Sequence, residues 1–145
     1  MVFKKILAIL IGGMVLCTGL TASAYAETTN SLVESEVTPA YEIASSVMSN
    51  LNISGTTAYC TSSATTIDAV SITVEQTLQK QGFLWLWYGV DDANWITTVN
   101  KNAISVDHTK SGLSSGKYRL KSVFTFKDKN GKSETVTVYS AEKNV

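Results

Sequence analysis

Few residues in this chain have the chemistry of a catalytic or metal-binding site. His108 is the only histidine, and a zinc site needs several Cys or His ligands at a characteristic spacing. Asp107 precedes it, but neighbours on a strand point to opposite faces, so the two do not form a base with its orienting carboxylate. Asp91 and Asp92 lack the patterned carboxylates of a calcium loop, and no phosphate loop or nucleophile elbow occurs. The sequence therefore predicts a non-enzyme without cofactor or metal.

The first 26 residues have the pattern of a cleavable signal peptide. Lys4 and Lys5 precede an apolar run over residues 6–20, and small residues lead to a cleavage site after Ala26. The run is short for a bilayer of about 30 Å, which argues against a retained membrane anchor. We therefore expect a secreted protein, extracellular or associated with the cell wall, that begins near Glu27.

Cleavage changes the cysteine count. Cys17 is lost with the signal peptide and Cys60 remains alone, so no disulfide can form within the mature chain. Free cysteine is among the most buried residue types. We expect Cys60 to be a buried, inert core side chain, and the alternative is an intermolecular bridge or a reactive thiol.

The mature chain is large enough for one domain. Removing 26 of the 145 residues leaves 119, and removing two of the twelve basic residues leaves ten against twelve acids, a net charge of −2. This balance does not indicate a nucleic-acid partner. Residues 27–50 are rich in Ser, Thr and Glu and are predicted to be a flexible or loosely docked leader. Residues 51–145 are predicted to form the folded domain.

Short apolar stretches bounded by Gly, Ser, Thr or Asp predict an all-β domain. About seven strands in some ninety residues favour an antiparallel sandwich of two sheets. The predicted strands lie at residues 51–60, 67–79, 83–90, 95–99 and 102–108, followed by two long strands within residues 113–140.

The two long strands are joined by the turn Asp128-Lys129-Asn130-Gly131, whose length sets their register. A two-residue Asn-Gly loop would place Phe124 opposite Thr137 and mix core with solvent faces. A three-residue loop, with Gly131 left-handed as a G1 bulge, places Phe124 opposite Val136. We predict the three-residue loop, with a structural role for Gly131.

One corner of the chain resembles immunoglobulin-like domains. The segment Leu113-Ser114-Ser115-Gly116-Lys117-Tyr118 is similar to the corner before strand F, in which a Tyr hydroxyl bonds to upstream backbone. The succession ISGTTAYCTS, ITVEQTLQKQG, SSGKYRL and SETVTVYS also resembles small secreted single-domain proteins of Gram-positive bacteria without an assigned function. The resemblance implies an immunoglobulin-like β-sandwich, with Phe83–Tyr88 at the place of strand C. It implies no catalytic residues.

Every tryptophan lies in one aromatic segment, residues 83–95. On a strand, Phe83, Trp85 and Trp87 would share one face. An exposed face that includes Trp85, Trp87 and Trp95 could stack on sugar rings or anchor a protein partner. We expect instead that both faces are covered, because core tryptophans are typical of sandwiches.

A second candidate surface is a basic stripe. Arg119, Lys121 and Lys127 alternate with apolar residues and would share the outer face of the first long strand. Such a stripe could meet an anionic cell-wall polymer or lipid surface. We favour a protective role, because surface Lys discourages edge-to-edge pairing of strands and keeps β-rich proteins soluble.

These observations predict an exported, non-catalytic binding or structural module at the bacterial cell surface or in the medium. Its partner would be an anionic wall polymer, a glycan or a protein. The alternative is a small carbohydrate-binding or antimicrobial exoprotein that uses residues 83–95.

Overall fold

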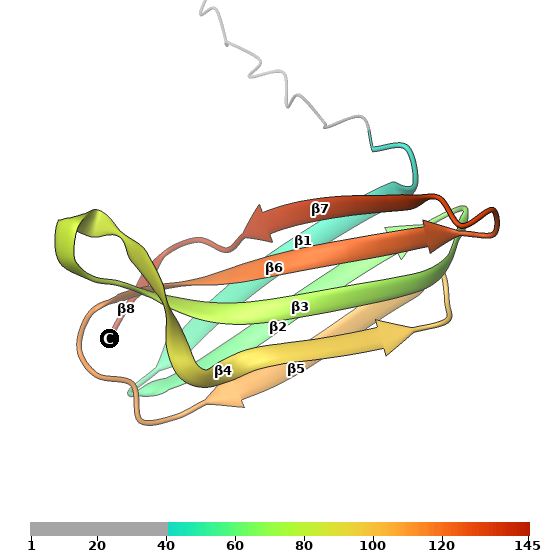
Figure 1. Cartoon of the computed structure of the whole chain (residues 1–145). Helices are drawn as coiled ribbons and strands as arrows, with labels where there is room; N and C mark the ends of the chain where they lie inside the picture. Colours follow the sequence, from blue (N-terminus) through green and yellow to red (C-terminus); the bar gives the residue numbers. More distant parts are fainter. Residues whose placement is uncertain (1–40) are drawn as a thin grey trace, which may run out of the picture. The chain divides into compact units, whose positions relative to one another are not determined.

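Residues 41–145, the part of the chain that the computed structural model describes, form two antiparallel β-sheets packed face to face (Figure 1). One sheet has the order β1-β2-β5; the other has the order β4-β3-β6-β7, with β8 also pairing with β6. The prediction of an all-β domain built from two sheets is confirmed. The predicted signal peptide and residues 27–40 of the predicted leader lie outside the described residues. The elements are β1 (Ala44–Ser54), β2 (Thr57–Thr66), β3 (Ala69–Gln81), the 3-10 turn η1 (Phe83–Trp85), β4 (Trp87–Val99), β5 (Ala103–Lys110), β6 (Lys117–Asp128), β7 (Ser133–Tyr139) and β8 (Lys143–Asn144).

The β6–β7 hairpin has the predicted register and turn. Phe124 pairs with Val136, and alternate residues of β6 are buried while their neighbours are partly exposed. Gly131 has φ 83°, and its N–H donates to the Asp128 carbonyl at 3.1 Å. The Asp128 N–H in turn donates to the Lys132 carbonyl at 2.9 Å, which closes the three-residue loop.

Strand β1 starts earlier than predicted. It begins at Ala44, so residues 44–50 belong to the sheet and the predicted leader boundary at residue 50 is wrong. The predicted single strand at 51–60 is also wrong, because Gly55 (φ 58°) turns the chain between β1 and β2. As an edge strand β1 buries only part of its side chains, which explains why its composition reads as polar.

A carboxylate on β7 holds the start of β1. Glu134 accepts hydrogen bonds from the N–H groups of Glu42, Ile43 and Ala44 at 2.9–3.0 Å. Burial raises the pKa of this carboxyl, but the three N–H donors and nearby Lys132 lower it further, so its pKa lies below the usual range. The ionised form of Glu134 is therefore the form that ties β1 to β7.

Polar residues divide the core into two apolar clusters. One cluster surrounds the buried Phe124 and Phe126, and the other surrounds Leu78, Leu120 and Tyr118. Between them, five polar side chains are joined in a row that we call the polar belt. Its bonds join His108 Nδ1 to Gln76 Oε1 (2.6 Å), Gln76 Nε2 to Ser62 Oγ (2.6 Å), Ser62 Oγ to Ser122 Oγ (2.7 Å) and Ser122 Oγ to Ser49 Oγ (2.8 Å).

Among residues 41–145 there is no helix long and apolar enough to cross a membrane.

Candidate functional site

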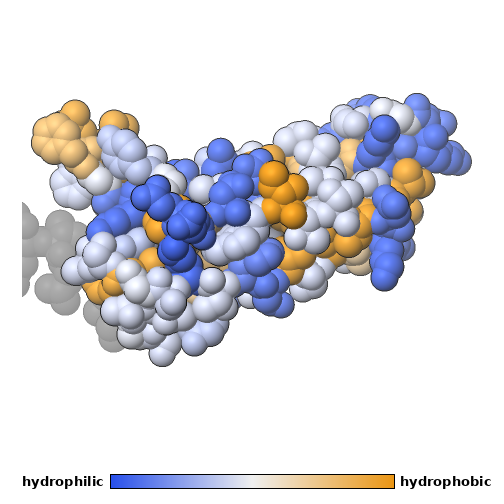
Figure 2. Space-filling view, turned by 60° about the horizontal axis from the view of Figure 1, so that its bottom comes forward, coloured by the Kyte–Doolittle hydropathy of each residue, from blue (hydrophilic) through white to orange (hydrophobic). Residues whose placement is uncertain are grey.

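The β3–β4 hairpin curls away from the sandwich at one end (Figure 1). Its turn carries exposed apolar side chains. We call residues 83–86 the aromatic tip. Phe83 and Trp85 are 80% and 79% exposed, and Leu84 and Leu86 are exposed as well. In the space-filling view the end of this hairpin forms an apolar projection at the upper left (Figure 2). Large apolar side chains gathered in this way on a surface indicate an interaction site.

The prediction of a covered strand at residues 83–90 is wrong. Residues 83–85 form the turn η1, in which Leu84 and Trp85 have φ values of 55° and 62°. The Leu86 N–H donates to the Phe83 carbonyl at 3.3 Å, and the Gly82 N–H donates to the Leu86 carbonyl at 2.8 Å. Phe83 and Trp85 therefore do not share a strand face with Trp87.

A glycine allows the base of the tip to close tightly. A β-carbon on Gly82 would lie 2.8 Å from two ring carbons of Tyr88, so the ring rests against the backbone at this point. In the strand register Tyr88 is opposite Lys80, and Trp87 is opposite Gln81. The two aromatic residues that follow the tip are thus fixed on opposite faces of the hairpin.

On the outer face, a guanidinium lies between two aromatic rings. Arg119 of β6 is 4.3 Å from the ring centre of Trp87 and 4.2 Å from that of Tyr139, and its Nε donates to Gln79 Oε1 at 2.8 Å. Stacking of this kind holds both the cation and the Trp87 ring in place. The predicted contact residues Arg119 and Trp87 are therefore brought together, with Tyr139 as a partner that sequence reasoning missed.

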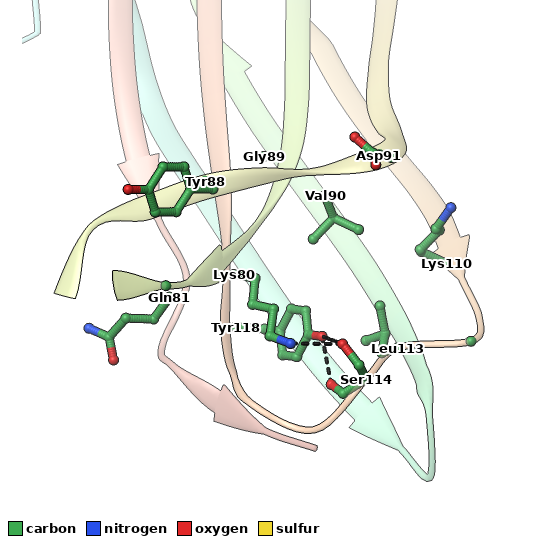
Figure 3. A pocket seen from close by; sticks show the side chains of 12 residues that line it. Lys80, Gln81, Tyr88, Gly89, Val90, Asp91, Lys110, Leu113, Ser114 and Tyr118 are labelled. Carbon is green, nitrogen blue, oxygen red and sulfur yellow. Dashed lines mark hydrogen bonds between the residues drawn. The ribbon is translucent and has the colours of Figure 1, made fainter. Parts of the chain in front are cut away.

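On the inner face, the hairpin borders a pocket of about 560 Å³ (Figure 3). Lys80 crosses its floor: Nζ donates to Ser114 Oγ at 2.7 Å and lies 5.6 Å from the ring centre of Tyr118. The Tyr118 hydroxyl donates to the Ser114 carbonyl at 2.7 Å, the bond expected for this corner. The pocket is lined by Lys80, Gln81, Gly82, Tyr88, Gly89, Val90, Asp91, Lys110, Gly112, Leu113, Ser114 and Tyr118.

The other predicted contact residues lie apart from the tip. The Trp95 ring stacks on His108, with ring centres 4.8 Å apart, and packs against the core, so it joins the edge strands β4 and β5 of the two sheets. Lys121 and Lys127 are on the outer face of β6 as predicted, but Lys127 lies eight residues beyond Arg119, about 25 Å along an extended strand. The basic stripe and the aromatic tip are therefore separate surfaces.

Cys60 lies in the core. It is 1% exposed, and burial raises the pKa of its thiol to about 12. The predicted burial of this residue is confirmed, and the thiol is protonated at neutral pH.

The tip could have been recognised from one signal in the sequence. Ten residues, Gln81 to Val90, carry no charge, and Gly82 stands immediately before the aromatic run. Glycine between two polar strands is a hairpin signal, which the continuous apolar run obscured.

No family model and no curated protein matches this chain. Among solved structures, two crystal forms of wild-type OgpA from Akkermansia muciniphila are similar, each with 12% sequence identity and a TM-score of 0.36. The matches cover 72% and 71% of this chain, and 31% and 32% of the OgpA chain. This chain thus spans about a third of the length of OgpA.

Proposed function

We propose that this protein is an exported, non-catalytic binding module that contacts a component of the bacterial cell surface through the aromatic tip. The observation that carries the proposal is the exposure of Phe83 and Trp85 on a turn whose backbone is unfavourable for both Leu84 and Trp85. Each such conformation costs of order 1–3 kcal/mol, and strained residues of this kind cluster at functional sites. Folding alone gives no reason to keep large apolar rings at that position.

The strand order supports an immunoglobulin-like type for this module. Strands β1, β2 and β5 lie in one sheet and β3, β6 and β7 in the other, as do strands A, B, E and C, F, G of immunoglobulin domains. In this alignment strand C is β3, so the aromatic segment lies in the hairpin after strand C. Export in this proposal rests on the signal-peptide pattern of residues 1–26.

Co-sedimentation with purified cell envelopes tests the proposal. The variant Phe83→Ser with Trp85→Ser should be retained at least about tenfold less than the wild type, because most of the apolar contact area is lost. The matched control is Ile96→Ser, which removes a 65% exposed apolar side chain from the outer face of β4. Equal retention of all three proteins contradicts the proposal.

A second variant in the same experiment tests whether the basic stripe, rather than the tip, makes the contact. The variant Lys121→Glu with Lys127→Glu alters the basic stripe and leaves the tip intact. Loss of retention in this variant alone would assign binding to the stripe, whereas wild-type retention would leave these lysines with the protective role.

A carbohydrate-binding exoprotein is a second candidate, which the pocket favours. The exposed Tyr88 is one of the residues that line it, together with the polar residues Asp91 and Ser114. Sugar rings stack on aromatic side chains while their hydroxyls bond to such polar groups. For this candidate, Tyr88→Ala should abolish binding of soluble wall glycans and the double Ser variant of the tip should retain it.

A further inference from the structure

We propose that the aromatic tip inserts into the interfacial region of a lipid bilayer and that two cations at its base face anionic headgroups. This inference rests on the proposed function and names the partner of the same site. In this proposal the folded domain stays in water and only the aromatic tip enters the bilayer interface.

The shape and composition of the tip fit a bilayer. The tip is convex, and the stretch Gln81–Val90 carries no charge. A protein partner would have to supply a pocket for each protruding ring, whereas a bilayer accepts apolar side chains without a preformed cavity. Phe and Leu favour the acyl boundary, and Trp and Tyr favour the headgroup level.

The side chains are ordered along the hairpin in the sequence of layers that a bilayer presents. Phe83 and Trp85 stand at the end, Trp87 and Tyr88 follow at the first paired positions, and cations lie beside these two. Arg119 stacks on Trp87, and Lys80 is the register partner of Tyr88. At about 3.4 Å per residue along a strand, the rings and the cations are separated by a distance comparable to the depth of about 5–10 Å to which apolar side chains enter the bilayer interface.

Charge complementarity favours anionic lipids. Among residues 41–145, neither Arg119 nor Lys80 has a carboxylate within 4.0 Å; the two ion pairs there are Lys117 with Glu142 and Lys132 with Glu42. The nearest acids along β4, Asp91 and Asp92, lie past Val90; Asp91 lines the same pocket as Lys80 but makes no ion pair with it. Lys80 donates to the Ser114 hydroxyl and Arg119 donates to the Gln79 side-chain carbonyl, so both cations are hydrogen-bonded to neutral groups and neither charge is neutralised.

The site is also held in place before it binds. The Arg119 guanidinium is fixed by two rings and by Gln79, and the Tyr88 ring rests on Gly82. A preorganised surface loses less conformational entropy when it binds. The strained turn then serves to point the rings outward.

Vesicle binding by the exported form of the protein tests the inference. The probes are vesicles of phosphatidylcholine alone, vesicles of phosphatidylcholine mixed with phosphatidylglycerol, and lipid-free wall sacculi. The wild type should sediment with the mixed vesicles, and the double Ser variant at Phe83 and Trp85 should bind at least about tenfold less. Ile96→Ser should bind like the wild type. All variants have the same N-terminal residues, so any binding by those residues is equal in all of them and does not affect the comparison.

Two further readouts locate the contact. With Trp87→Phe and Trp95→Phe, Trp85 is the only tryptophan, and its emission should move to shorter wavelength when mixed vesicles are added. Lys80→Gln should weaken binding to mixed vesicles by about fivefold, with little effect on pure phosphatidylcholine, and Lys127→Gln should do neither.

The failure of this inference can be told from the failure of the proposed function. Retention on lipid-free sacculi that depends on the tip, without vesicle binding or an emission shift, overturns the bilayer and leaves a wall-binding module. Absence of binding to envelopes, sacculi and vesicles overturns both. Vesicle binding that survives the double Ser substitution also overturns the inference.

Discussion

Two hairpin turns of this domain solve the same problem in opposite ways. The β6–β7 turn has Gly131 at its left-handed position, and the Asp128 carboxylate accepts the N–H groups of Asn130 and Lys132, each at 2.8 Å. The β3–β4 turn has positive φ at Leu84 and Trp85, where Asn-Gly is the usual choice. The first turn has the residues that its backbone favours. The second has bulky apolar residues where its backbone disfavours them, which is the difference expected if the first turn serves folding and the second serves the proposed contact.

The largest effect should come from giving the second turn the chemistry of the first. Replacing Leu84→Asn together with Trp85→Gly should raise the free energy of unfolding by about 2 kcal/mol, because both positive φ values then suit their residues. Urea denaturation measures the change. The same variant should lose envelope retention. Unchanged or lowered stability would mean that the turn is not strained.

The reverse substitution should weaken the first turn. Gly131→Ala should lower the free energy of unfolding by between about 1 and 2 kcal/mol, because a β-carbon is disfavoured at φ 83°. Gly131→Asn is the matched control and should cost less, since Asn tolerates the left-handed region. A Gly131→Ala protein as stable as the parent would remove the contrast between the two turns.

A substitution in the Tyr118 corner at the pocket should lower the stability of the fold, whereas substitutions in the aromatic tip should not. Tyr118→Phe removes the hydroxyl that donates to the Ser114 carbonyl and should cost about 1 kcal/mol. The double Ser variant of the tip should change stability by no more than about 0.5 kcal/mol, as exposed substitutions do. Thermal melts of both proteins measure the difference. A stable Tyr118→Phe protein, or a destabilised tip variant, would reverse these roles.

The smallest effect concerns Cys60, whose thiol should not react with reagents while the protein is folded. A water-soluble thiol reagent at neutral pH should label Cys60 only after denaturant is added, because the side chain is 1% exposed and its pKa is near 12. The unfolded thiol ionises near 9.0, so burial of the neutral thiol stabilises the fold fully below that pH, and this contribution is lost as pH rises from 9 towards 12. Rapid labelling of the native protein would place Cys60 at the surface.

Local patterns predicted the β6–β7 hairpin, and distant contacts explain what was missed. The alternation around Phe124 and the turn at Gly131 lie within one hairpin, so the sequence contains the information for the register. The start of β1 depends on Glu134, some ninety residues away, which no local window includes.

The tip shows the same limit at the candidate site. An apolar run such as residues 83–88 satisfies strand propensity whether or not anything covers it. It is exposed because β3 and β4 are long enough to extend past the end of the sandwich (Figure 1). The lengths of the other strands set where the sandwich ends, so a local stretch of sequence does not reveal this exposure. The pairing of Arg119 with Trp87 and Tyr139 likewise required three strands to be placed side by side.

The polar belt has a consequence for how the two sheets fit together. Each of its four bonds crosses from one sheet to the other, through β5, β3, β2, β6 and β1 in turn. Apolar faces tolerate a small slide, but a shift by one residue pair would leave the buried Gln76 amide without partners, at a cost of about 1–3 kcal/mol. The belt therefore favours a single alignment of the two sheets, in a domain with no disulfide among the described residues. Because the pocket beside the tip is lined from both sheets, by Lys80 of β3 and Lys110 of β5, this alignment also fixes its dimensions.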